Sequence, residues 1–277
     1  MKNILITAIG SPSFITSRKA IRSMTSISDV VIHGCDTNPS CLGYRLADKS
    51  FTVPSGTDDE YIPILLKYCE QNKIDLLIPC ADEELLPISK SKFLFEKIGC
   101  RVLISPESAL KIVLNKAKLY QHCQKSSLSE YIPKYYVCKN VNEIRQAYKN
   151  LLNLGHKVCI KPAVTHGSRG FRIIEKTPTK EEFFNKKASP HNITIEMLCQ
   201  ILGTSSFPDI LVMEYLPGIE YSVDCFKSEK DFLCVPRTRE IIKDGICVSG
   251  RSVENNSLIA ASKQIYNEFG LCYNANI

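Results

Sequence analysis

The chain has 277 residues, of which 44% are hydrophobic, enough for a folded protein of two or three lobes. Its 35 basic and 29 acidic residues give a net charge of +6, but the basic residues are scattered and form no dense stripe interleaved with aromatics. This pattern argues against nucleic acid as the main partner.

The thirteen cysteines contain no Cys-x-x-Cys pair, the spacing that a zinc ribbon or a redox dithiol needs. Many unpaired thiols are typical of a reducing cytoplasm, where we expect this protein to reside. The early apolar run at residues 4–9 is short and leads into a glycine turn, unlike a signal peptide. No run approaches the length of a membrane span, so we expect no membrane partner.

Strand and helix patterns alternate through the first hundred residues. Strands are predicted at 2–7, 29–35, 75–79 and 101–104, and helices at 14–24, 57–72 and 82–99. Thr57 and Glu60 have the spacing of a capping box for the second helix. The alternation predicts an open parallel sheet with helices on both faces, which binds ligands at the carboxyl ends of its strands. Those ends are residues 7–13, 36–38 and 80–84.

Acidic residues at these ends have two readings. Asp82, Glu83 and Glu84 fall in a first helical turn, where the helix dipole favours acids whether or not they bind substrate. Asp36 follows a strand, as a ribose-binding acid does in a dinucleotide site. However, residues 7–12 lack the G-x-G-x-x-G spacing that such a site uses.

The pattern changes after residue 105. A helix begins at Ser105-Pro106, and Asn115-Lys116 falls within helical sequence. Further elements are then expected in this order: strand 135–138, helix 142–154, strands 157–161, 170–174 and 210–214, strands 221–226 and 232–235, a hairpin turning at 244–245, helix 257–269 and strand 271–277. The last strands and the hairpin suggest an antiparallel sheet.

One ordered set of residues predicts ATP binding. Lys161 ends a short apolar strand and offers a positive charge for phosphate, and the small-residue loop 163–170 follows at once. Glu214 lies where a later strand ends and Glu220 where the next begins. Backbone groups near Glu214 would meet the adenine edge, and the Glu220 carboxylate would accept from ribose hydroxyls.

With these motifs the chain resembles the ATP-grasp superfamily, and within it the carbamoyl-phosphate-synthase-like branch. The resemblance covers essentially the whole chain. It implies that residues Lys116 and Lys161 contact the nucleotide phosphates, although the family usually has Asp before the first lysine and this chain has Asn115. It implies further nucleotide-binding roles for a loop over the phosphates, an adenine hinge and a ribose acid: His166, Gly167, Ser168, Arg169 and Gly170; Glu214, Tyr215 and Leu216; and Glu220. Arg239 lies where relatives place a catalytic basic residue near the acyl phosphate.

The resemblance also implies the fold, of mixed α/β and α+β class. A doubly wound parallel-sheet domain, the pre-ATP-grasp domain, is expected at residues 1–105. The small ATP-grasp lobe with a helical lead-in is expected at 106–217, and the start of a C-terminal lobe, incomplete here, at 218–277.

The activity that the resemblance implies is an ATP-dependent ligase. Such an enzyme activates a small-molecule carboxylate as an acyl phosphate, and an amine or similar nucleophile then captures it. Relatives bind Mg²⁺ through a Glu-x-Asn-Pro segment that follows the strand matching 272–277, so the metal ligands are expected beyond residue 277 and none is named within it. Either the chain is a fragment of a longer enzyme, which the intact upstream motifs favour, or it has lost efficient catalysis.

Two other functions stay open at this point. One is a nucleotide-binding module that senses or scaffolds without turnover. The other is an NAD-type dehydrogenase that uses the first domain. The identity of the carboxylate and of the nucleophile is not specified by the sequence, nor is the oligomeric state, with a homodimer among the options.

Overall fold

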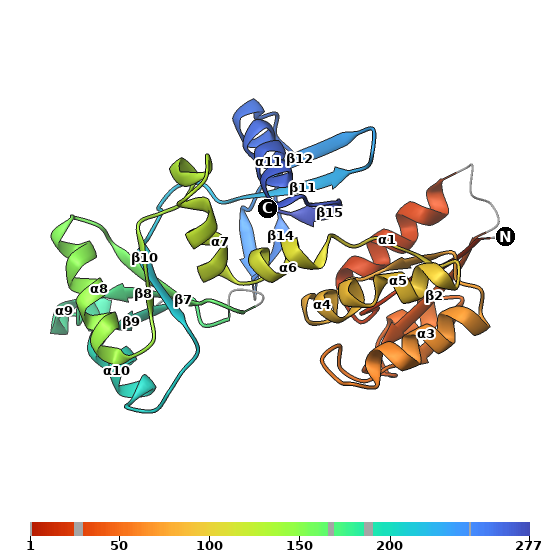
Figure 1. The fold of residues 1–277 in the computed structure, drawn as a ribbon. Helices are drawn as coiled ribbons and strands as arrows, with labels where there is room; N and C mark the ends of the chain where they lie inside the picture. Colours follow the sequence, from red (N-terminus) through yellow and green to blue (C-terminus); the bar gives the residue numbers. More distant parts are fainter. Residues whose placement is uncertain (1, 25–29, 166–168, 186–190, 244) are drawn as a thin grey trace. The chain divides into compact units, whose positions relative to one another are not determined.

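The computed structural model describes residues 2–24, 30–165, 169–185, 191–243 and 245–277 (Figure 1). The chain divides into two compact units, each assembled from separate stretches. The first comprises Met1–Lys111, Asp224–Cys234 and Tyr266–Ile277, and the second comprises Ile112–Val223 and Val235–Ile265. The three-part division expected from the sequence stays a prediction.

The sheet of the first unit has five parallel strands in the order β3-β2-β1-β4-β5. They are β1 (Lys2–Ile6), β2 (Val30–Asp36), β3 (Lys49–Thr52), β4 (Leu76–Ile78) and β5 (Arg101–Val102). The winding reverses between β1 and β4, which is where doubly wound sheets bind ligands. The predicted doubly wound domain is therefore confirmed.

Apolar side chains cover both faces of this sheet. Ile6 packs with Phe14 of helix α1 (Pro12–Ser23) on one face. Side chains alternate along a strand, so Leu5 points to the opposite face, where it is fully buried. The remaining helices of this part of the chain are α2 (Gly43–Leu46), α3 (Tyr61–Gln71), α4 (Asp82–Lys90), α5 (Lys92–Lys97) and α6 (Glu107–Val113).

Two helix predictions in this unit need correction. Thr57 and Glu60 do not form a capping box, because α3 begins only at Tyr61 and has no side-chain cap. Thr57 belongs instead to a turn, where its N–H donates to Ser55 Oγ at 3.4 Å. The single helix expected over 82–99 is two helices, which meet at Ser91.

The second unit contains a five-stranded mixed sheet in the order β6-β10-β7-β8-β9, antiparallel except for the parallel pair β8 and β9. Its strands are β6 (Tyr135–Cys138), β7 (Val158–Pro162), β8 (Arg172–Glu175), β9 (Asn192–Thr194) and β10 (Ile210–Glu214). Its helices include α7 (Lys116–Cys123), the 3₁₀ turn η1 (Ser129–Tyr131), α8 (Val141–Asn153), α9 (Lys180–Asn185) and α10 (Ile195–Leu202).

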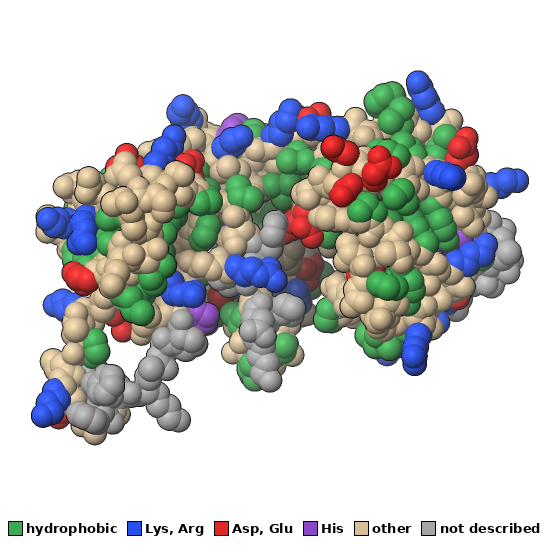
Figure 2. Space-filling model, turned by 90° about the horizontal axis from the view of Figure 1, so that it is seen from below, with side chains coloured by type: hydrophobic (Ala, Val, Ile, Leu, Met, Phe, Trp, Pro, Cys, Tyr) green, Lys and Arg blue, Asp and Glu red, His purple; other side chains and the backbone are tan. Residues whose placement is uncertain are grey.

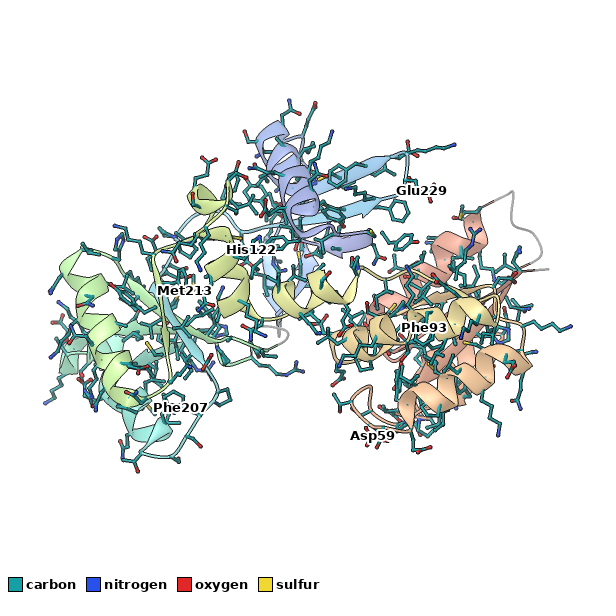
Figure 3. All side chains as sticks on the ribbon, viewed as in Figure 1. Asp59, Phe93, His122, Phe207, Met213 and Glu229 are labelled. Carbon is teal, nitrogen blue, oxygen red and sulfur yellow. The ribbon has the colours of Figure 1, made fainter. Side chains whose placement is uncertain are left out.

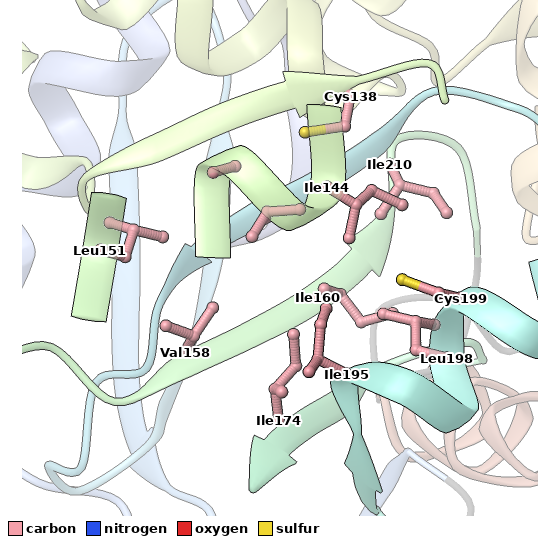
Figure 4. Packing of buried hydrophobic residues seen from close by; sticks show 12 residues of the cluster. Cys138, Ile144, Leu151, Val158, Ile160, Ile174, Ile195, Leu198, Cys199 and Ile210 are labelled. Carbon is pink, nitrogen blue, oxygen red and sulfur yellow. The ribbon is translucent and has the colours of Figure 1, made fainter. Parts of the chain in front are cut away.

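The core of this unit lies between the sheet and helices α8 and α10 (Figure 4). Ile144 and Leu151 lie on one face of α8, Val158 and Val212 project from the sheet, and all four are fully buried. Helix α8 begins with Asn140 as its N-cap, whose side chain accepts from the Glu143 amide. The strongly amphipathic pattern of α8 explains why the sequence predicted it well.

The last strands are antiparallel, as expected from the sequence. Strands β11 (Tyr221–Lys227), β12 (Phe232–Thr238) and β15 (Tyr273–Asn276) form one sheet in the order β12-β11-β15. Strands β13 (Ile241–Lys243) and β14 (Ile246–Ser249) form the predicted hairpin, and helix α11 (Asn256–Phe269) precedes β15.

Among the described residues, no helix is long and apolar enough to cross a membrane. On the face seen in Figure 2, Lys and Arg side chains are spread among neutral and acidic ones.

A buried histidine makes the stability of the first unit dependent on pH. His33 of β2 is fully buried, with its ring nitrogens 3.0 Å from Tyr68 Oη and 3.3 Å from Asn3 Oδ1. Burial and the nearby Lys49 ammonium lower the pKa of His33 to about 4, against the opposing effect of Asp48. The unfolded chain takes up this proton near pH 6.5, well before the folded chain does.

We therefore expect the protein to lose stability as the pH falls from about 6.5 towards 4, because protonation favours the unfolded chain in that window. Melting temperatures of the wild type and of His33→Gln, measured across this window, test the expectation. The glutamine variant keeps polar groups but does not titrate, so its profile should be flatter. Parallel profiles for the two proteins would show that His33 is not responsible.

Candidate functional site

The N-terminus of α7 is attached to the end of β7. The Lys116 amide donates to the Ala163 carbonyl at 2.8 Å. Asn115 is the N-cap of α7, with its Oδ1 accepting from the amides of Ala117 and Lys118 at 3.0 and 3.1 Å. The expectation that Asn115-Lys116 falls within helical sequence holds for Lys116, the first residue of α7, whereas Asn115 precedes the helix as its cap. The cap needs only a side-chain oxygen, which Asn supplies as well as the Asp usual in the family.

Two lysines are held beside the same loop. Lys116 Nζ donates to the Thr165 carbonyl at 2.9 Å, and Lys161 Nζ donates to Tyr120 Oη at 2.8 Å. The Lys161 ammonium also lies 5.0 Å from the centroid of the Tyr120 ring, within cation–π range. Since Tyr120 lies one helical turn after Lys116 on α7, this helix positions both cations.

A small apolar cluster holds α7 on the sheet. Ala117, Ala163 and Leu211 are buried together, with Tyr120 and Tyr135 packed against them. Small side chains at Ala117 and Ala163 allow the helix to approach the strand closely. The positions of the two ammonium groups thus follow from packing as well as from hydrogen bonds.

The loop after β7 is constrained at both ends of its described part. Thr165 Oγ1 donates to the Arg169 carbonyl at 2.9 Å. Gly170 has φ +75°, and a Cβ at this position would lie 2.7 Å from Pro162 Cγ. The loop therefore needs glycine at position 170. His166, Gly167 and Ser168, the other predicted loop residues, lie outside the described residues.

Glu214, the first residue of the predicted adenine hinge 214–216, is held in place by contacts of its side chain. Glu214 follows Met213, labelled in Figure 3, and its carboxylate contacts His156 Nδ1 at 2.9 Å and accepts from the Lys134 amide at 2.7 Å. The next amide, Tyr215 N–H, donates to the Lys157 carbonyl at 2.7 Å. The Glu214 side chain thus fixes the backbone of the hinge.

Sequence reasoning missed the partners Tyr120 and His156. His156 has no ligand-like spacing with other histidines, and nothing in the local sequence marks Tyr120. Each contacts a predicted site residue that is distant in sequence, so only the three-dimensional structure identifies it.

Glu220 and Arg239 form an ion pair. The Arg239 Nε lies 3.0 Å from Glu220 Oε1, and the Arg239 amide donates to the Glu220 carbonyl at 2.9 Å. The guanidinium also donates to Ser222 Oγ at 3.2 Å and to the Gly245 carbonyl at 2.8 Å. The Arg239 side chain is 16% exposed and that of Glu220 is 60% exposed, so the arginine is held while the carboxylate reaches solvent.

The carboxyl ends of the strands in the first unit are tied together by two acids. Asp36 accepts from the amides of Gly10 and Asn38 at 2.7 and 2.9 Å. Glu84 is 3% exposed and accepts from the Cys80 amide at 2.8 Å and from the Tyr61 hydroxyl. Both carboxylates therefore clamp loops to one another.

Glu84 has further donors, Thr7 Oγ1 and the Ala81 amide. Burial and the charge of Glu84 raise the pKa of Tyr61, so this phenol stays protonated and donates to the carboxylate. Of the predicted acidic cluster, only Asp82 and Glu83 are exposed.

In the described ranges, no group of three or more His, Cys, Asp or Glu side chains is arranged to hold a metal ion. We therefore name no metal ligand among these residues and assign no step to Mg²⁺. A cavity of about 510 Å³ lies between α8 and α10, and its lining, which includes Asn140, Arg145 and Phe207, contains none of the predicted site residues.

Comparison with known families matches two stretches that together make up more than half of the chain. Residues 4–103 match the PylC-like N-terminal domain, and residues 206–277 match the ATP-grasp domain of the biosynthetic pathway with the Ter operon. A search of curated protein sequences finds no match.

Solved structures share the fold at low sequence identity. N5-carboxyaminoimidazole synthetase from Staphylococcus aureus has a TM-score of 0.61 and 14% identity, and the similarity covers 96% of this chain and 62% of that one. A biotin carboxylase complex with β,γ-ATP from Campylobacter jejuni has a TM-score of 0.62 and 15% identity, over 99% of this chain and 61% of that one.

The biotin carboxylase domain of Hydrogenobacter thermophilus 2-oxoglutarate carboxylase, solved with MgADP, ADP and bicarbonate, has a TM-score of 0.64 and 12% identity. This similarity covers 99% of the present chain and 60% of the other. The chain thus spans about three fifths of the length of these structures.

Gly170 offers a direct test of the loop geometry. We expect Gly170→Ala to destabilise the attachment of the loop to β7 by about 1–2 kcal/mol, because the residue combines a left-handed φ with a close approach to Pro162. Native-state hydrogen exchange of the β7 and β8 amides measures this effect. The matched control is Gly218→Ala, since no atom lies within 4 Å of an added Cβ there and the φ of Gly218 is not in the left-handed region. Equal exchange rates in the two variants would contradict the prediction.

Proposed function

We propose that this chain, which matches a PylC-like N-terminal domain over residues 4–103 and an ATP-grasp domain over residues 206–277, acts as an ATP-dependent ligase that activates a carboxylate as an acyl phosphate for capture by an amine or similar nucleophile. The observation that carries this proposal is the placement of Lys116 and Lys161 beside the loop after β7. The two residues are far apart in sequence, and a single helix brings both to one place.

These lysines are suited to polyphosphate. Each ammonium has three N–H donors, and the bonds described above go to neutral oxygens, a carbonyl for Lys116 and a phenol for Lys161. A charged phosphate oxygen is a stronger acceptor than either. We therefore expect both lysines to turn towards the α- and β-phosphates when ATP binds.

The loop would cover the transferring phosphoryl group. Small residues let backbone N–H groups come close to phosphate oxygens, and the constraint at Gly170 fixes where the loop returns to the sheet. His166, Gly167, Ser168, Arg169 and Gly170 form the segment to which we assign this role. A closed loop would exclude water from an acyl phosphate, which water would otherwise hydrolyse.

The hinge offers backbone groups to adenine. Because Tyr215 N–H already donates within the protein, we assign the adenine edge to the backbone of the next residue, Leu216, whose side chain is 60% exposed. Glu220 would accept from the ribose hydroxyls through its solvent-facing carboxylate. Its partner Arg239 would orient that carboxylate and place positive charge near the reacting groups.

The chemistry then has two steps. A carboxylate oxygen attacks the γ-phosphorus and ADP leaves, and the nucleophile next attacks the acyl carbon and phosphate leaves. Positioning and neutralisation of charge are the main demands of such a transfer, and lysine and arginine side chains meet them.

The family branch and the substrate class have separate support. The assignment to the carbamoyl-phosphate-synthase-like branch rests only on the sequence motifs that this chain shares with that branch. The bicarbonate and MgADP in one structure of similar fold support a small carboxylate as the substrate class.

Removal of one ammonium tests the nucleotide site. We expect Lys161→Ala to weaken ATP binding about 10- to 100-fold, the range expected when a charged hydrogen bond is lost. Isothermal titration calorimetry measures the affinity, and circular dichroism verifies that the variant is folded. Lys118→Ala is the matched control, because Lys118 lies on the same helix and is exposed. Unchanged affinity in the folded Lys161 variant would refute the site.

Turnover separates a ligase from a nucleotide-binding module. With ATP and Mg²⁺ present, we expect a panel of small carboxylates, bicarbonate included, to contain one that stimulates ADP release, and Lys161→Ala to abolish the stimulation. A coupled assay for ADP measures the rate, and thermal shift with ATP and Mg²⁺ measures binding in the same samples. Stabilisation by ATP without ADP release for any carboxylate would favour the non-catalytic module.

A further inference from the structure

Two cysteines face each other on neighbouring strands. Cys225 lies on β11 and Cys234 on β12, and their sulfur atoms are 3.5 Å apart. Both are thiols in the structure. A contact this short between sulfurs needs only a small movement to become a covalent bond, which is about 2.05 Å long.

The register of the hairpin places this pair where a disulfide fits. Ser228 N–H donates to the Asp231 carbonyl at the turn, beside Glu229 in Figure 3, and Arg239 N–H donates to the Glu220 carbonyl at the other end. Counting along the strands from either bond puts Cys225 opposite Cys234, in a pair without backbone hydrogen bonds. The Cα atoms of such pairs are about 4.5 Å apart, within the range of about 4.4–6.8 Å found for disulfides.

The two thiols differ in exposure. Cys225 is 4% exposed, and its strand is held in place because the Tyr266 hydroxyl donates to the Cys225 carbonyl at 3.1 Å. Cys234 is only half-buried. A reagent in solution therefore reacts first with Cys234, and the shielded Cys225 thiol then reacts with the modified Cys234.

We propose that Cys225 and Cys234 form a redox modification site, which low-molecular-weight disulfides such as oxidised glutathione convert to a cross-strand disulfide. The Cys234 thiolate attacks one sulfur of the oxidant, forming a mixed disulfide and releasing one reduced thiol. The Cys225 thiolate then attacks Cys234 Sγ, and the second reduced thiol leaves. The two cysteines together lose two protons and two electrons, and the oxidant gains them.

Another close pair shows why exposure matters. Cys69 and Cys100 share a hydrogen bond, but they are 1% and 0% exposed. Neither sulfur can meet a reagent in the folded protein. Oxidation under native conditions should therefore select the hairpin pair.

Peptide mapping of the folded chain tests the proposal. The wild-type protein is incubated with oxidised glutathione, free thiols are alkylated, and the protein is digested with trypsin without reduction. Cleavage after Lys187, Lys227, Lys230 and Arg237 yields peptides 188–227 and 231–237, the second with Cys234 as its single cysteine. We expect these two peptides to be joined by a disulfide, with fragment ions assigning the bond to Cys225 rather than Cys199, and dithiothreitol to separate them.

Two variants test which cysteines form the linked species. Cys234→Ser should remove the linked species, and Cys247→Ser, at a half-buried cysteine of the following hairpin, should leave it unchanged. Glutathione attached to Cys234 without further reaction, both cysteines alkylated, or Cys234 joined to a different cysteine would each overturn the proposal. The wild-type map decides the question even if a variant does not fold. Its outcome is independent of ATP binding, so failure of one proposal does not affect the other.

Discussion

The hydrogen bond from the Lys116 amide to the Ala163 carbonyl is the constraint on which the proposed nucleotide site depends. It joins the first residue of α7 to the residue after β7, and so determines where the helix starts relative to the sheet. Together with the packing around Ala117, this contact places Lys116 beside Thr165 and Tyr120 beside Lys161. If the residues of this helix were shifted by one position along its axis, each side chain would turn by about 100°, and the Lys116 side chain would no longer face the loop.

Much of the fold could be predicted from the sequence because the core segments follow simple periodicities. Strands β6 and β10 have the predicted bounds, as their apolar runs are short and sharply ended. Strand β3 was missed because Lys49–Thr52 is a polar edge segment whose strand conformation comes from pairing with β2. Helix α10 was missed as well, although Thr194 caps it, because it is a short and mostly apolar segment, which periodicity alone does not distinguish from a buried strand.

The site residues divide in the same way. Lys161 and Glu220 could be proposed from the sequence because the motif around each is local: a strand end followed by a small-residue loop, and an acid just before a strand. The carboxylate of Glu214 turned out to hold the hinge through His156 and the Lys134 amide, contacts that join residues far apart in the chain. Local sequence can indicate that such a residue lies near a ligand, but which of its groups faces that ligand is decided by tertiary contacts.

The Asp36 carboxylate shapes one edge of the sheet in the first unit. Its two oxygens accept from the Gly10 and Asn38 amides, and these bonds connect the turn after β1 to the end of β2. A carboxylate has about four acceptor positions, so a ligand hydroxyl at this edge would share these oxygens with the two amides. The acid is thus part of the wall of this edge, and its loss would loosen both turns at once.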